Sequence, residues 1–235
     1  MPRRREEQLA LPIRTWGGAR RGAGRPPNGA RAGVSHLVRP NHSAAHPVHV
    51  TLRTADGVPN LRGRRTFDAV VEALRAGCER PDSRVVHFSV QSNHVHLIAE
   101  AKDGVALSRL IQGLSIRIAR SVNRATSRTG RVFGDRYHSR ALGTPLEVHR
   151  ALGYVLCNFQ KHSAPSDRRL VGFMDGCSSA PWFDGWKIPD ATERALGLHR
   201  SILGDPPVAS PRTWLLRSGY RKHGLVDPNR APRRR

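Results

Sequence analysis

The chain has 235 residues, and its 40 Lys and Arg against 18 Asp and Glu give a formal net charge of +22. Such an excess indicates a polyanionic partner, for which nucleic acid is expected and no membrane, with an anionic membrane surface or nonspecific binding as the weaker alternatives; no apolar run approaches the ~20 residues of a membrane span. Three scattered cysteines without CxxC spacing exclude a disulfide framework and a cysteine zinc site, and they predict a reducing cytoplasm, in association with the nucleoid.

Residues 1–45 are rich in Gly, Pro, Ala and Arg without hydrophobic periodicity, which predicts a disordered basic arm. Within it, Gly24-Arg25-Pro26 looks like the core of an AT-hook, in which an arginine lies in the minor groove of DNA. The alternative is a solvated tail that only touches phosphates. Arg25 is therefore a candidate nucleic-acid contact.

The ordered part is predicted to begin at residues 47–53, PVHVTLR, whose alternation of apolar and polar residues indicates a half-buried strand. Residues 66–80 place apolar side chains at helical spacing, which predicts a helix. Two further strands are expected at residues 84–90, RVVHFSV, and 94–100, HVHLIAE, joined by the short turn Gln91-Ser92-Asn93.

Residues 107–122 repeat apolar side chains on one side of a long predicted helix. Arginines lie toward its other side, namely Arg109, Arg117, Arg120 and Arg124. They are either a solvated helix face or a track for nucleic-acid phosphates, and the sequence leaves both interpretations open. Residues 130–142, GRVFGDRYHSRAL, are expected to form a further strand or an extended hairpin.

The clearest helix start is TPLE at residues 144–147, with an N-cap threonine, a proline at the first helical position and a capping-box glutamate. We expect this helix to reach about Ser163. The order of elements then predicts an α+β fold over residues 46–163, a ferredoxin-like βαββαβ(α) sandwich with an antiparallel sheet. Residues 164–235 are expected to form a basic accessory segment with one helix near 190–203.

The strand at 94–100 carries an unusual pair, His94 and His96. Alternate side chains of a strand share a face, so both imidazoles should lie on one, open face, while Val95 and Leu97 point to the core on the other. Two neighbouring imidazoles can hold a metal ion. The structural alternative is a pair of strand histidines that bond locally.

The capped helix carries a polar stripe at i, i+4, i+8 and i+11, formed by Arg150, Tyr154, Asn158 and Lys161. The phenol could be a nucleophile, the amide oxygen a metal ligand and the cations phosphate clamps. With the two histidines this would make a phosphoryl-transfer site on DNA, since two imidazoles and one amide oxygen leave open positions on a divalent ion.

Other candidates lie on the remaining strands. Tyr137 is the rival nucleophile because it lies between Arg136 and His138, although a strand aromatic more often packs or stacks on a base. His49 shares a face of the first strand with Arg53, and for this pair a DNA contact and a structural role are equally plausible. The candidate nucleic-acid contacts are Arg25, His49, Arg53, Arg117, Arg120, Arg124, Arg136, Arg140, Arg150 and Lys161.

At these residues the sequence resembles a known family. HVH at residues 94–96, in the context SNHVHLI, looks like the HUH motif of single-tyrosine transposases. HVTLR, GRVFGDRYHSRAL and ALGYVLCNFQKH fit the branch called REP-associated tyrosine transposases, and the resemblance covers roughly residues 46–163.

The resemblance implies a ferredoxin-like core, a divalent metal (Mg²⁺ or Mn²⁺) and single-stranded DNA near a hairpin as substrate. Cleavage would leave a 5′-phosphotyrosine and a free 3′-OH. By the same resemblance, His94 and His96 become metal ligands, Tyr154 the nucleophile and Asn158 the third ligand. A homodimer is also implied, because one tyrosine per chain handles one strand end.

Two other functions stay open at this point. A rolling-circle replication initiator also combines an HUH motif with a later tyrosine, and it differs in acting at a plasmid origin. A catalytically silent protein with this fold would bind hairpin DNA for repression. The four residues His94, His96, Tyr154 and Asn158 favour an enzyme, since a silent protein has no physical need for all of them.

Overall fold

The computed structural model describes residues 41–158 and 174–229, so Arg25 and Lys161 lie outside the described residues, as does most of the predicted arm over residues 1–45. The elements in chain order are β1 (Val48–Arg53), α1 (Arg64–Arg75), β2 (Glu79–Arg80), β3 (Ser83–Val90), β4 (His94–Ala101), α2 (Gly104–Ala125), β5 (His138–Ala141), α3 (Pro145–Leu156), η2 (Ala180–Trp182), α5 (Asp190–Leu203), α6 (Trp214–Arg217) and η3 (Gly219–His223).

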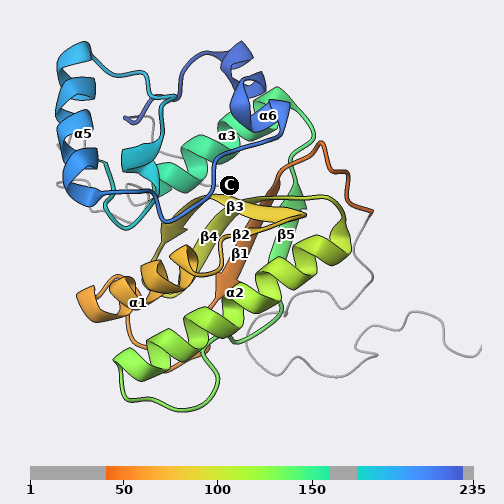
Figure 1. The fold of residues 1–235 in the computed structure, drawn as a ribbon, viewed down its shortest axis with the longest axis vertical. Helices are drawn as coiled ribbons and strands as arrows, with labels where there is room; N and C mark the ends of the chain where they lie inside the picture. The colour runs from red at the N-terminus through yellow and green to blue at the C-terminus, as the bar shows by residue number, and fades with distance from the viewer. Residues whose placement is uncertain (1–40, 159–173, 230–235) are drawn as a thin grey trace, which may run out of the picture. The chain divides into compact units, whose positions relative to one another are not determined.

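The five strands form one antiparallel sheet in the order β2-β3-β4-β1-β5 (Figure 1). Without the two-residue β2, the first strand lies between the third and the fourth, as in a split βαβ arrangement. In the centre of the sheet, Val50 of β1 lies opposite Leu97 of β4 and Ser139 of β5. The predicted ferredoxin-like sandwich on an antiparallel sheet is confirmed.

Helices cover both faces of the sheet (Figure 1). On one face, α1 and α2 pack through Leu74 and Leu114 against strand residues such as Leu97. On the other face, Leu152 of α3 joins Ile98 of β4 in a second apolar cluster. The face with the histidines is therefore covered, whereas the strand pattern alone suggested an open one.

Three predicted boundaries differ from the structure in detail. The first helix ends at Arg75 instead of residue 80, because residues 79–80 leave the helix and pair with residues 83–84. Within residues 130–142 only β5 is a strand, apart from an isolated bridge at Phe133. The third helix ends at Leu156, seven residues before the expected Ser163, which lies outside the described residues.

The start of α3 follows the sequence prediction. Thr144 is the N-cap, and its hydroxyl accepts a hydrogen bond from the backbone N–H of Glu147 at 3.2 Å. The Glu147 carboxylate in turn accepts from the backbone N–H of Gly143 at 2.9 Å and from Arg140 at 2.7 Å. This reciprocal capping fixes where the helix begins.

Residues 174–229 pack against the same unit instead of extending from it. Asp175 forms a bidentate ion pair with Arg62, with N–O distances of 2.9 and 2.7 Å. The backbone N–H of Ser179 donates to the Phe88 carbonyl of β3 at 3.0 Å. Over the residues that the structure describes, no helix has the length and apolar character that crossing a membrane requires.

Candidate active site

The pairing of β1 with β4 places polar side chains on one face of the sheet. In this register His96 lies opposite Thr51, and His94 lies opposite Arg53. The alternate residues of β4, including Val95 and Leu97, belong to the apolar core under α1 and α2. The alternation of the sequence is therefore what turns both imidazoles to one face, as predicted, and in the structure α3 covers that face.

The two imidazoles meet through their outer nitrogens. Nε2 of His94 and Nε2 of His96 are 3.0 Å apart, and the ring centroids are 4.6 Å apart. Nδ1 of His94 lies 2.8 Å from the amide oxygen of Asn93, to which it donates. A neutral His94 that carries its proton on Nδ1 has an unprotonated Nε2, so its lone pair points to the same place as the Nε2 of His96.

The inner nitrogen of His96 has two polar neighbours on β1. Its Nδ1 lies 3.1 Å from the Thr51 hydroxyl and 3.1 Å from Nε2 of His49. His96 itself is 3 % exposed. Burial, reinforced by the positive charges of His138 and Arg140, lowers the pKa of His49 to about 4, so this ring is neutral near pH 7.

Tyr154 reaches the histidines from α3. Its ring centroid lies 5.2 Å from that of His96 and 5.7 Å from that of His49, both in edge-on geometry. The helix is held over the sheet by the buried side chains of Leu152 and Val155. Ala151 is buried in the same cluster, and it lies one turn before Tyr154, which packs against that cluster. Residues one turn apart lie on the same side of a helix, so this side of α3 carries Tyr154 toward β4.

Asn158 follows Tyr154 by four residues and is 1 % exposed. Neither its amide oxygen nor its amide nitrogen has a hydrogen-bond partner among the described residues. A buried, unsatisfied amide costs free energy and is rare, so it indicates a ligand that completes the site. Its predicted role as a metal ligand stays a prediction.

The residues present fit the divalent metal that the sequence resemblance implied. Two ligand atoms about 2.1 Å from an octahedral ion and at right angles to each other lie about 3 Å apart, which matches the convergence of the two Nε2 atoms. Among residues 41–158 and 174–229, no group of three or more His, Cys, Asp and Glu could hold a metal. A metal here would therefore need the Asn158 amide, water or substrate oxygens beside the two imidazoles.

The rival nucleophile lies on the other side of the sheet. Tyr137 packs against the apolar cluster under α1 and α2, and its hydroxyl lies 3.1 Å from that of Ser108 on α2. Tyr154, in contrast, has the ring contacts with His49 and His96 given above.

The predicted nucleic-acid contacts fall into two groups. On the histidine side, Arg53 lies opposite His94, and Arg140 lies opposite His49 at the β5 edge of the sheet. Arg150 is exposed on α3. Arg140 also pairs with Glu147 at 2.7 Å, so its charge is partly neutralised.

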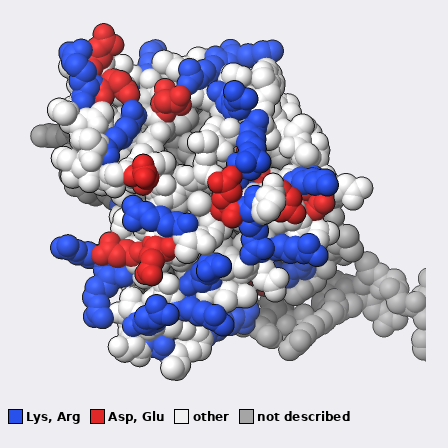
Figure 2. Space-filling model, viewed as in Figure 1, with Lys and Arg blue, Asp and Glu red and all other residues white. Residues whose placement is uncertain are grey.

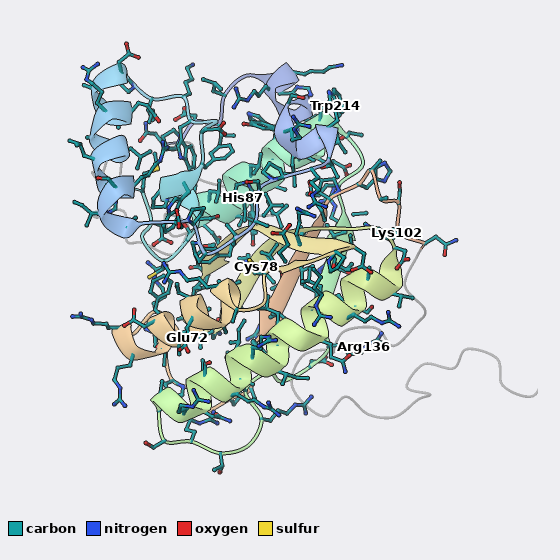
Figure 3. All side chains as sticks on the ribbon, in the orientation of Figure 1. Glu72, Cys78, His87, Lys102, Arg136 and Trp214 are labelled. Atoms are coloured by element: carbon teal, nitrogen blue, oxygen red, sulfur yellow. The ribbon has the colours of Figure 1, made fainter. Side chains whose placement is uncertain are left out.

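The second group lies with α2, away from the histidines. Arg117, Arg120 and Arg124 are exposed, and the opposite side of α2 packs on the sheet through Leu114. Figure 3 shows Arg136 beside α2. On the face drawn in Figure 2, basic side chains gather over the region of α1 and α2. The arginines of α2 lie on the face of the sheet opposite α3 and Tyr154, and the role of all four as DNA contacts stays a prediction.

Two polar neighbours of the histidines were not found from the sequence. Thr51 was treated only as part of an alternating strand, and Asn93 only as part of a turn. A weak signal existed for each, since Thr51 shares a strand face with His49 and Asn93 directly precedes His94. The Thr51 contact depends on the pairing of β1 with β4, which neither motif specifies, whereas Asn93 contacts its own neighbour in sequence.

The chain is similar in sequence to a known protein family. Residues 43–156 match the family model described as "Transposase IS200 like", which agrees with the resemblance drawn from the motifs and supports a transposase-like, DNA-binding function. The search of curated proteins found no match. A solved structure described as the REP-associated tyrosine transposase bound to a REP hairpin is 15 % identical, with a TM-score of 0.45, and the match covers 76 % of this chain and 92 % of that one.

Proposed function

We propose, on the premise that residues 43–156 belong to the IS200-like transposase family, that this protein nicks and rejoins single-stranded, hairpin-associated DNA through a 5′-phosphotyrosine intermediate. The observation that carries the proposal is the meeting of three side chains from two elements. His94 and His96 converge on β4 with 3.0 Å between their Nε2 atoms, and the Tyr154 ring lies 5.2 Å from the His96 ring.

The proposed reaction is a transfer of one phosphoryl group. The phenolic oxygen of Tyr154 attacks a DNA phosphorus and gives its proton to water, and the bond from that phosphorus to the 3′ oxygen breaks. The leaving oxygen takes a proton and becomes a free 3′-OH. In the reverse direction, the 3′-OH of a strand attacks the phosphotyrosine, so the phenol is released and the strand is sealed without a nucleotide cofactor.

His94, His96 and Asn158 would hold a divalent cation, Mg²⁺ or Mn²⁺. When bound, such an ion polarises a phosphate oxygen and favours in-line attack. This help matters because a phenol with a pKa of about 10 is a weak nucleophile near pH 7. Arg53 and Arg140 lie on the same side of the sheet and are suited to bind the negative phosphates.

Each chain contains the histidine pair and a tyrosine that lies against it. A homodimer would bring two such sites to the two strand ends of an element. We place this activity in the cytoplasm, where the chromosomal DNA is accessible.

The test is incubation of the full chain with Mn²⁺ and labelled single-stranded hairpin DNA from the repeats that flank its gene, followed by a denaturing gel. We expect a covalent adduct with the wild type and with Tyr137→Phe, the matched control, and none with Tyr154→Phe. An adduct lost only in Tyr137→Phe would move the nucleophile to the other face of the sheet.

The remaining outcomes separate the other functions. DNA that shifts on a native gel without any adduct, over several flanking repeats, would indicate a silent hairpin-binding protein. Cleavage restricted to a plasmid origin would instead indicate a replication initiator.

A further inference from the structure

His49 occupies a position between the two parts of the proposed site. It lies on β1, the central strand that pairs with both β4 and β5. Its Nε2 is 3.1 Å from Nδ1 of His96, and its ring lies edge-on to Tyr154 with 5.7 Å between centroids. One half-buried side chain thus contacts both a metal-binding histidine and the nucleophile.

A histidine that binds a metal through one nitrogen needs a fixed partner at the other. That partner sets the ring orientation and decides which nitrogen carries the proton. For His96 the metal-facing atom is Nε2, and Nδ1 must then carry the proton and donate it. The acceptors within reach are Nε2 of His49 and the hydroxyl of Thr51, both at 3.1 Å.

The two acceptors differ in what else they contact. The Thr51 hydroxyl is a small group on β1, whereas the His49 ring also lies within 5.1 Å of the His96 ring and supports the edge of Tyr154. A displacement of His49 would therefore disturb the ligand and the nucleophile together. Thr51 has no ring with which to support Tyr154.

We propose that His49 is a positioning residue, which orients His96 through Nδ1 and fixes the Tyr154 ring beside it. This inference rests on the proposed function and adds a role that the sequence did not assign, since His49 was there a candidate DNA contact with an unspecified structural role equally plausible. In this role His49 acts through two other side chains and need not touch DNA.

Two substitutions separate the two contacts. His49→Phe keeps a ring beside Tyr154 but has no nitrogen for His96, whereas His49→Gln keeps a polar group near the Nε2 position but has no ring. Thr51→Val is the matched control, because it removes the other neighbour of Nδ1 at constant size. Thermal unfolding of each variant checks folding. If His49→Phe does not fold, His49→Leu replaces it in the Mn²⁺ measurement alone, which depends only on the missing nitrogen.

The first readout is Mn²⁺ affinity without DNA, from the electron paramagnetic resonance signal of the free ion. We expect His49→Phe to bind Mn²⁺ about 10- to 100-fold more weakly, as is typical when the partner of a ligand histidine is lost. His49→Gln should stay within about 3-fold of the wild type, because its amide oxygen can accept the same proton.

The second readout is the single-turnover rate of adduct formation at saturating Mn²⁺ and DNA. Here the order should reverse, with His49→Phe close to the wild type and His49→Gln slower, because only the ring supports Tyr154. A purely structural role would lower the melting temperature but would not reverse the order of the two variants.

Several results would overturn the inference. Wild-type Mn²⁺ affinity in His49→Phe, with a loss in Thr51→Val, would assign the orienting role to Thr51. Unchanged Mn²⁺ affinity with weaker hairpin binding on a native gel would make His49 a DNA contact. If the wild type itself bound no Mn²⁺, both the proposed metal centre and this inference would be wrong. In the first two cases only this inference would be wrong.

Discussion

The carboxylate of Glu100 provides a sharp test of how the C-terminal segment is attached. Glu100 lies on β4, on the same strand face as His96, and is 4 % exposed. Its carboxylate accepts hydrogen bonds from the backbone N–H groups of Arg212 and Thr213, both at 2.8 Å, and from the Thr213 hydroxyl at 2.7 Å. Nε of the buried Arg84 lies 3.8 Å from it.

Glu100→Ala should therefore destabilise the protein by about 3 kcal/mol. Removal of one partner from a buried charged pair costs about 3–5 kcal/mol. The lower end applies here, because Arg84 keeps a second carboxylate, Glu79, at 2.6 Å, and because water can reach the partly exposed Thr213. Glu100→Gln keeps the shape but loses the charge, so about 1.5–3 kcal/mol is expected.

The measurement is urea unfolding followed by tryptophan fluorescence, which reports on the segment because Trp214 directly follows Thr213. Glu79→Ala is the control, since its half-exposed ion pairs should contribute less than about 1 kcal/mol. If Glu100→Ala cost no more than Glu79→Ala, the buried carboxylate would not be what fastens residues 212–217 to β4.

Four further predictions concern α3 and its ends. Leu152→Ala should lower the free energy of unfolding by about 2–5 kcal/mol, because the side chain is fully buried between helix and sheet, and a loss below 1 kcal/mol in urea unfolding would contradict this packing. Thr144→Ala should cost about 1 kcal/mol in the same assay through loss of the N-cap, whereas Thr144→Ser should restore it. The hydrogen bond from Arg140 lowers the pKa of Glu147. The wild type should therefore be more stable than Glu147→Gln above about pH 5, and this difference should disappear as the pH falls through the lowered pKa. A difference in stability that does not change with pH would show that the ion pair is absent in solution. Asn158→Leu should weaken Mn²⁺ binding at least about 10-fold without lowering the melting temperature, because both amide atoms are buried without a hydrogen-bond partner among the described residues. A clear loss of stability would show instead that the amide is hydrogen-bonded within the fold.

The sequence by itself determined the local parts of this protein. Alternation along β4 sufficed to put His94 and His96 on one face, because side chains of a strand alternate whatever the strand pairs with. The threonine-proline-glutamate signature located the start of α3 to the residue, because a helix cap is made by neighbours in sequence. The order of strands and helices was also sufficient to predict the ferredoxin-like sheet.

Only the tertiary structure decided how these parts meet. His49 and His96 are separated by 47 residues, and their contact exists because β1 pairs with β4 in one register. A shift of that register by one residue would turn His49 to the opposite face. The same long-range packing placed Tyr154 beside the histidines and Tyr137 on the other side of the sheet with α2, although the sequence offered both tyrosines as candidate nucleophiles. Local patterns specify which face a side chain takes, whereas contacts across the sheet depend on the sum of the core packing, which no single motif encodes.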